Sequence, residues 1–241
     1  MARRRRRRAL RPLPLLLAVF LVAVLLVLAY HWREHERQRR AAERPVAARV
    51  IDAARVDPRL DGRPVVARGR LTAEGELADP VFGVRARGLA LLRRVEMRQW
   101  QERRAADGSA SYAAVWSERP IESSRFARAA EHANPRMPFA SAVFRPARLR
   151  LGGYLLPLEA VDPLLDRAEP LPATAEALPE NLAASFVLRE GVLHTAADPE
   201  QPAIGDLRIR FLVLRPRDAE LEAIVRGGRL EPRGPLREPV R

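Results

Sequence analysis

The chain of 241 residues contains no cysteine. It can therefore form no disulfide bond, and it has neither a thiolate nucleophile nor a zinc or iron–sulfur site held by cysteine. The four histidines, His31, His35, His132 and His194, are too few and too scattered to predict a metal site made of histidine. We therefore expect neither a metal nor any other cofactor.

Lysine is also absent, so all 43 basic residues are arginine. Seven of these arginines lie within residues 1–12, and removing them from the net charge of +13 leaves +6 for the rest of the chain. Aromatic residues make up only 5% of the sequence, and they do not alternate with a basic stripe as in the usual nucleic-acid-binding surfaces. We therefore expect no nucleic-acid partner.

One long uncharged run occupies residues 13–30, LPLLLAVFLVAVLLVLAY. As a helix, a segment of this length spans roughly 27 Å, which is close to the ~30 Å hydrocarbon core of a bilayer. The arginine-rich residues 1–12 favour a cytoplasmic N-terminus, which places the rest of the chain on the periplasmic or lumenal side. We predict a single-pass signal anchor in the membrane bilayer, with a signal peptide cleaved near Ala29 as the alternative.

The rest of the chain divides into three parts. Residues 31–45 predict a charged helical stalk that continues the membrane segment. Residues 46–226 contain no further segment that could cross a membrane and are long enough for one extracytoplasmic domain with a real core. Residues 227–241 predict a disordered tail, because their composition offers little apolar surface to bury. The stalk arginines expected to contact acidic lipid head groups are Arg33, Arg37 and Arg40.

Residues 46–226 predict an α+β fold that is β-rich and mainly antiparallel, with short helices. Residues 88–100 alternate apolar and charged side chains, and the Asp107-Gly108 turn and residues 111–118 then complete a hairpin. Residues 206–214 alternate in the same way. Further strands are expected within 64–71, 143–153, 185–194 and 221–228, and short helices at 123–130 and 158–166.

Six motifs follow one another in this domain: VEMRQW (95–100), YAAVWSE (112–118), SSRF (123–126), EHANP (131–135), LGGYLL (151–156) and IGDLRIRF (204–211). Together they resemble the transmembrane protein 43 family, also called LUMA, over about residues 60–226. The motif residues that we take as structural or interaction candidates are Val95, Glu96, Met97, Gln99, Trp100, Tyr112, Trp116, Phe126, His132, Asn134, Pro135, Gly152, Gly205, Asp206 and Arg208.

The resemblance implies a membrane protein with an N-terminal span and a large lumenal domain. Eukaryotic members are associated with the endoplasmic reticulum and the inner nuclear membrane, where they self-associate and bind other membrane proteins. The family normally continues into several C-terminal spans, and this sequence stops before them, so we expect a short form. Because the resemblance implies no catalytic residue, we expect a non-enzymatic scaffold that forms homo-oligomers and binds other membrane proteins.

Two other functions are consistent with the residues. Glu131, His132 and Asp206 could serve an envelope hydrolase if their side chains met in one cleft. The structural interpretation is that His132 and Asn134 bond the backbone at a helix end and that Asp206 forms a turn. The other alternative is lipid-surface binding through the stalk arginines. Trp100 and Trp116 are expected to contact each other across the hairpin in the core.

Overall fold

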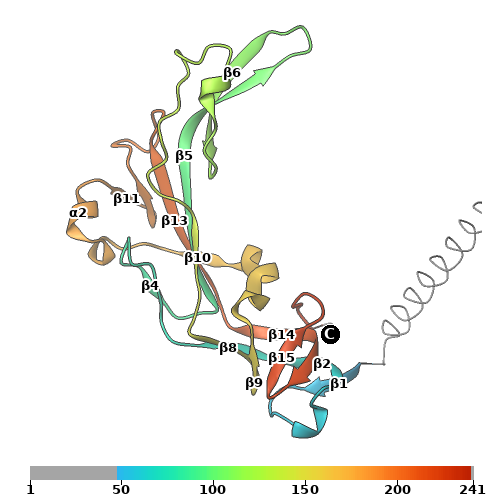
Figure 1. Cartoon of the computed structure of the whole chain (residues 1–241). Coiled ribbons are helices and arrows are strands. Elements are labelled where there is room, and N and C mark those ends of the chain that lie inside the picture. The colour runs from blue at the N-terminus through green and yellow to red at the C-terminus, as the bar shows by residue number, and fades with distance from the viewer. Residues whose placement is uncertain (1–47, 240–241) are drawn as a thin grey trace, which may run out of the picture. The chain divides into compact units, whose positions relative to one another are not determined.

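The computed structural model describes residues 48–239 (Figure 1). The predicted basic tail, membrane segment and stalk, with Arg33, Arg37 and Arg40, lie outside the described residues. Within the described part, 44% of the residues are in strands and 12% in short helices. The fold is therefore mainly β, and the α+β prediction is wrong. No helix within residues 48–239 is both long and apolar enough to cross a bilayer.

One of the two helices predicted in this domain is present at full length, and the other is much shorter. The helix expected at 158–166 is the 3-10 helix η3, Leu158–Arg167. The helix expected at 123–130 is only the 3-10 turn η2, Ser123–Arg125. Beyond it, the Ala127 N–H donates to Glu102 and the Arg128 N–H donates to the Tyr112 hydroxyl, so neither amide is available to a helix. The other short helices are η1 (Pro58–Leu60), η4 (Ala175–Ala177) and α2 (Glu180–Ala183).

The first sheet has six strands in the order β1-β2-β14-β15-β9-β8. Their bounds are β1 Arg49–Asp52, β2 Pro64–Glu74, β8 Arg148–Leu151, β9 Tyr154–Leu156, β14 Arg217–Arg226 and β15 Arg229–Pro232. Because β2 also pairs with β8, five of these strands form a closed ring, and β1 lies outside it, parallel to β2.

A glycine turn lets the chain pass tightly between β8 and β9. Gly152, from the LGGYLL motif, has a φ of 56°. A Cβ at this position would lie 2.1 Å from the carbonyl oxygen of Ala53, so no other residue fits without moving the backbone. The turn delivers Tyr154 into the core, where its hydroxyl accepts a hydrogen bond of 2.9 Å from the Asp57 amide.

The predicted disordered tail contributes to this first sheet. β15 lies within it, and Leu230 and Leu236 are 1% and 2% exposed in the core. The backbone of Arg237 also pairs with that of Glu220 on β14. The prediction of disorder from residue 227 onward is therefore wrong, because two buried leucines and a Gly227–Gly228 turn allow the chain to pair back on β14.

The second sheet has seven strands, with β11-β12-β13-β5-β6 as its main path and β10 and β7 as additional partners of β13 and β5. Their bounds are β5 Ala90–Arg104, β6 Ala110–Ser117, β7 Ala142–Phe144, β10 Glu169–Leu171, β11 Val187–Arg189, β12 Val192–His194 and β13 Leu207–Leu214. A separate pair consists of β3, Leu77–Ala78, and β4, Arg85–Ala86.

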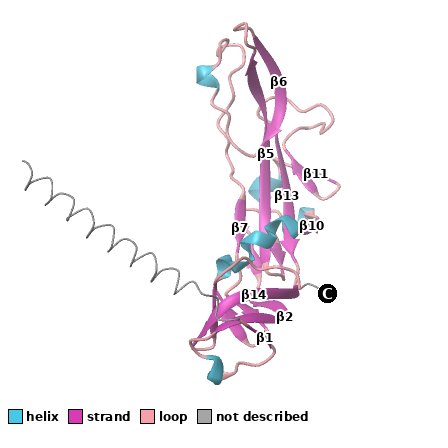
Figure 2. Cartoon of the chain, turned by 90° about the vertical axis from the view of Figure 1, so that its right-hand side faces the viewer, coloured by secondary structure: helices cyan, strands magenta, loops and turns pink. Residues whose placement is uncertain are grey.

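Strand β5 is the longest element and changes partners along its length. Its residues Ala90 to Met97 pair with β13, and its residues Met97 to Arg104 pair with β6. The β5–β6 hairpin consequently continues beyond the start of β13, as Figure 2 shows. This is the hairpin that alternation and the Asp107-Gly108 turn predict, and the Asp107 carboxylate accepts the Ser109 amide at 2.9 Å.

A buried ion pair fixes the second sheet to its neighbouring loops. The Nη1 of Arg93 donates to both carboxylate oxygens of Asp79, at 2.9 and 2.8 Å, and Asp79 is 0% exposed. The Nε of Arg93 donates to the Ala140 carbonyl at 3.0 Å, so a single guanidinium ties the loop before β4 to the segment before β7. Removal of either charged partner would leave an uncompensated buried charge.

Candidate interaction site

The motif residues meet along the β5–β6 hairpin, against a segment that we call the strap, residues 118–141. The first contact is made by Gln99, which is 0% exposed. Its Nε2 donates to the Arg119 carbonyl at 3.1 Å, and its Oε1 accepts from the Ile121 amide at 2.7 Å. One buried side-chain amide thus satisfies two backbone groups and fixes the start of the strap to β5.

Asn134, further along the strap, fixes it to the opposite edge of β5. Its Oδ1 accepts from the Trp100 amide at 2.7 Å, and its Nδ2 donates to the carbonyls of Trp100 at 2.9 Å and Ile121 at 3.2 Å. β13 pairs with β5 only as far as Leu207 opposite Met97. The Asn134 amide therefore takes the position of a strand residue that β13 does not supply.

The backbone just before β13 fills the gap between Met97 and Trp100. The Arg98 amide donates to the Asp206 carbonyl at 2.8 Å, and the Gly205 amide donates to the Arg98 carbonyl at 2.8 Å. The Asp206 carboxylate accepts from Thr195 Oγ1 at 3.0 Å and from the Ala203 amide at 2.7 Å, so it forms a turn. Two motifs distant in sequence thus cover one exposed strand edge.

Gly205 also allows the two motifs to touch. Its φ is 97°, and a Cβ there would lie 3.0 Å from the ring of Pro135. The left-handed backbone and the proline contact together explain why glycine precedes Asp206 and why proline follows Asn134.

An aromatic stack holds the middle of the strap on the hairpin. The His132 ring stacks on Tyr112, with centroids 3.6 Å apart and planes 10° apart, and it meets Trp100 edge-on at 4.8 Å. Phe126 packs beside Tyr112 at 6.0 Å. The Nδ1 of His132 lies 3.3 Å from the Arg128 carbonyl. His132 and Asn134 therefore do bond backbone groups, but not at a helix end: His132 bonds the Arg128 carbonyl within the strap, and Asn134 bonds Trp100 on the hairpin.

A small hydrogen-bond network closes the hairpin near its tip. The Tyr112 hydroxyl donates to Glu102 at 2.7 Å and accepts from the Arg128 amide at 2.9 Å. Burial opposes ionisation of Glu102, but hydrogen bonds from the Ala127 amide, Arg104 and Tyr112 outweigh it and lower its pKa. Burial, and then the bond to Glu102, raises the pKa of Tyr112.

A cluster of charged residues on β5 and β13 lies beside Trp116 of the hairpin. Arg208 donates to both oxygens of Glu96, at 2.7 and 2.9 Å, and Arg210 donates to the same carboxylate. Burial opposes ionisation of Glu96, but the two arginines outweigh it and lower its pKa. The Arg208 guanidinium lies 4.6 Å above the Trp116 ring. A cation in this position is attracted by the aromatic face.

The two tryptophans of the hairpin do not pack against each other as the sequence predicts. Trp116 is half-buried beneath Arg208, and Trp100 is half-buried against His132. The contact predicted between the two rings in the core is therefore wrong, because the cross-strand register sets Trp116 opposite Arg98 and Trp100 opposite Ala114. Each ring instead has a cationic or aromatic partner from another segment.

Three other candidate residues have structural positions within the two sheets. Val95 and Met97 are buried in the apolar cluster beneath the second sheet, together with Ile209 and Phe211. Gly152 belongs to the first sheet and takes no part in the interaction site. Glu102 and Thr195 were missed by sequence reasoning, because a Glu on a hairpin and a Thr in a loop carry no local signal for their distant partners.

The three residues of the hydrolase alternative are each bound to different groups. The Asp206 carboxylate accepts from Thr195 and Ala203, Glu131 lies 3.8 Å from Arg128, and His132 stacks between rings. The side chains of Glu131 and His132 both contact Arg128, at its guanidinium and at its carbonyl, whereas Asp206 shares no partner with them within the described chain. Among residues 48–239, no cluster of three His, Cys, Asp or Glu could hold a metal ion. The arrangement therefore favours attachment of the strap over acid–base chemistry.

Comparison with known proteins identifies the same family that the sequence motifs resemble. The family model described as transmembrane protein 43 matches residues 95–233, the stretch that carries the hairpin, the strap and β13. No solved structure matches the chain. The human protein named transmembrane protein 43 is 28% identical over 168 residues, and the rat protein of that name is 29% identical over 168 residues. In both cases the match covers 65% of this chain and 41% of the relative's length, and neither name denotes an enzyme. The chain belongs to the transmembrane protein 43 family.

Proposed function

We propose that the chain is a membrane-anchored, non-enzymatic interaction protein that binds further copies of itself and other membrane proteins. The observation that carries the proposal is that the motif side chains attach the strap to the hairpin and do not form a catalytic cluster. The side-chain amides of Gln99 and Asn134 form hydrogen bonds with the backbone of the hairpin and strap. The His132 ring packs against the rings of Tyr112 and Trp100. Such an arrangement makes a protruding hairpin rigid, and rigidity lowers the entropic cost of binding a partner.

Attachment to a membrane rests on the sequence and on the family. The uncharged residues 13–30 would hold the chain in the bilayer, with the arginines of residues 1–12 on the cytoplasmic side. The domain described here would then lie on the periplasmic or lumenal face. Confinement to a membrane raises the local concentration of the domain, so weak contacts between copies become sufficient for assembly.

The outer edge of β6 is the surface that we assign to self-association. Among residues 48–239, β6 pairs only with β5. Its residues Ser111 and Ala113 have small, exposed side chains that allow a second strand to approach. An unpaired strand edge presents N–H and C=O groups to another chain, and two copies of one edge can pair around a two-fold axis.

Cysteine crosslinking in membranes tests this surface without background, because the natural chain has no cysteine. Ala113 lies near the middle of β6, so two β6 edges that pair around a two-fold axis at this point bring the two Ala113 Cα atoms within roughly 4.5–5.5 Å. The variant Ala113→Cys should therefore form a disulfide-linked dimer on oxidation. The matched control is Ala183→Cys, an exposed alanine on α2. Equal dimer yields from the two variants, or monomer alone from both, would contradict the assignment.

A further inference from the structure

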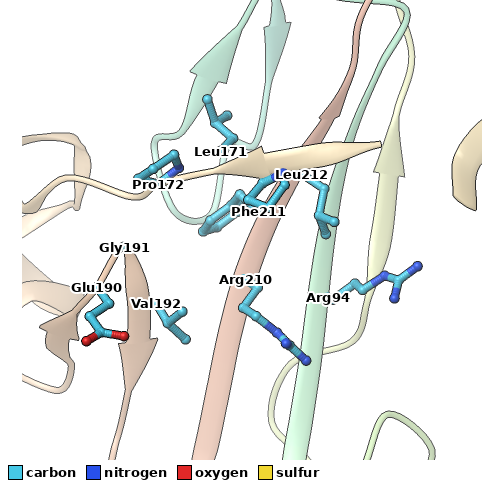
Figure 3. A pocket seen from close by; sticks show the side chains of 10 residues that line it. Arg94, Leu171, Pro172, Glu190, Gly191, Val192, Arg210, Phe211 and Leu212 are labelled. Carbon is cyan, nitrogen blue, oxygen red and sulfur yellow. The ribbon is translucent and has the colours of Figure 1, made fainter. Parts of the chain in front are cut away.

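A second feature of the molecule is a pocket next to the interaction site, with which it shares Arg210. This pocket, of about 160 Å³, opens where β10 and the β11–β12 hairpin both approach β13 (Figure 3). Its apolar walls include Pro172, Val192 and Leu212, and its charged lining residues are Arg94, Arg210 and Glu190. No candidate residue of the interaction site lines it.

The charges at this pocket are unbalanced. The register of β5 and β13 places Arg94 directly opposite Arg210, and like charges in this position repel each other. The neighbouring carboxylate, Glu96, is bound by Arg208 and Arg210. Arg94 is exposed and has no ion pair within residues 48–239. The rim of the pocket therefore carries an excess of positive charge, which favours an anion.

The strand pairing around the pocket selects among anionic ligands. β13 is paired with β5 on one edge and with β10 and β12 on the other. A peptide that binds in extended form needs an open strand edge for its main-chain hydrogen bonds, and β13 has none here. A ligand that needs only apolar contacts and a charged group fits better.

We propose that this pocket binds an anionic amphiphile, a single acyl chain with a carboxylate or phosphate head group. The head group would lie at Arg94, which has no ion pair in the described residues, and at the N–H groups of Arg210 that do not bind Glu96. A guanidinium can donate N–H bonds to either kind of oxyanion. The acyl chain would pack against Val192, Pro172 and Leu212. In Figure 3, Val192 and Arg210 lie between Glu190 and Arg94, so the acyl chain and not the head group would lie beside Glu190.

The volume limits the ligand further. About 160 Å³ is close to the size of an apolar cavity of ~150 Å³ that holds one benzene molecule. The pocket therefore holds part of one acyl chain and is too small for the two chains of a phospholipid.

Photo-crosslinking tests the proposal on the full chain in phosphatidylcholine nanodiscs. The probe is a long-chain fatty acid that carries a diazirine on its chain, and the labelled residues are mapped by mass spectrometry. We expect label within residues 170–172 and 190–192. We expect decanoate and decyl phosphate to displace it, and decanol and inorganic phosphate not to displace it. Equal displacement by inorganic phosphate would overturn the acyl-chain part, and equal displacement by decanol would overturn the anionic part.

Two variants separate binding from folding. Arg94→Gln should weaken labelling about tenfold, because it removes one charge-assisted contact. It should leave the melting temperature unchanged or slightly higher, since repulsion from Arg210 is relieved. Val192→Phe should block labelling by filling the pocket. The control is Arg63→Gln, another exposed arginine without an ion pair in the described residues. Labelling spread over the chain, or unchanged in both pocket variants, would overturn the proposal.

Discussion

The attachment of the strap to β5 should depend on Asn134 more than on any other single side chain of the strap. Asn134→Ala removes one hydrogen bond accepted from the Trp100 amide and two donated to the carbonyls of Trp100 and Ile121. Each such bond contributes roughly 0.5–1.5 kcal/mol, and water can reach a half-buried position to replace part of the loss. We therefore expect the free energy of unfolding to fall by about 2–3 kcal/mol.

The replacement Asn134→Asp distinguishes lost volume from lost donors. It preserves the acceptor for the Trp100 amide but places a carboxylate oxygen opposite the carbonyls of Trp100 and Ile121. At neutral pH its cost should equal or exceed that of alanine, because two acceptors then face each other. A role based only on packing predicts the opposite order, with the near-isosteric aspartate tolerated better.

The assay is thermal unfolding of the full chain in nanodiscs, combined with amide hydrogen exchange. For a domain of this size the loss corresponds to a melting temperature lower by roughly 5–10 °C. Exchange of the Trp100 amide should accelerate, because Asn134 is its acceptor. The control is Asn181→Ala, the other asparagine of the chain, which is exposed on α2 and should change stability by less than about 0.5 kcal/mol. Equal effects of the alanine substitutions at Asn134 and Asn181 would refute the reasoning.

Three further substitutions test other parts of the structure. Asp79→Asn should cost about 3–5 kcal/mol in chemical unfolding because it leaves Arg93 charged and buried, whereas joint replacement of both by Leu and Met should cost much less. Glu96→Gln tests the pH dependence: the lowered pKa of Glu96 stabilises the fold above its ordinary value of 4.5, and that contribution is lost as pH falls below it. The stability difference between wild type and this variant should therefore shrink below pH 4.5, and a constant difference would contradict the ion pairing. Gly205→Ala should destabilise more than Gly108→Ala, since both have positive φ but only the first would contact a proline ring; equal melting temperatures would disprove that contact.

The strands that follow local rules could be predicted from the sequence. β5, β6 and β13 alternate apolar and polar side chains, and Asp107-Gly108 and Glu190-Gly191 mark the turns of two hairpins. The family could also be recognised, because the motifs that carry it, VEMRQW, EHANP and IGDLR, are retained in order.

What could not be predicted depends on contacts between distant residues. Nothing near Ser123 indicates that Glu102 and Tyr112 take the amides that a helix would use. Nothing near Asn134 indicates that it completes the edge of β5, more than thirty residues away. Leu230 and Leu236 are too few to indicate order by composition, and they are ordered because β14 is beside them.

The most direct test of the account combines the hairpin edge with the strap that supports it. Ala113→Cys dimers are quantified in membranes after oxidation, in the natural background and together with Asn134→Ala or Asn181→Ala. The account predicts that the dimer yield falls when Asn134 is replaced and is preserved when Asn181 is replaced. A dimer yield that is the same in all three backgrounds would contradict the claim that the strap holds the hairpin in a binding-competent form.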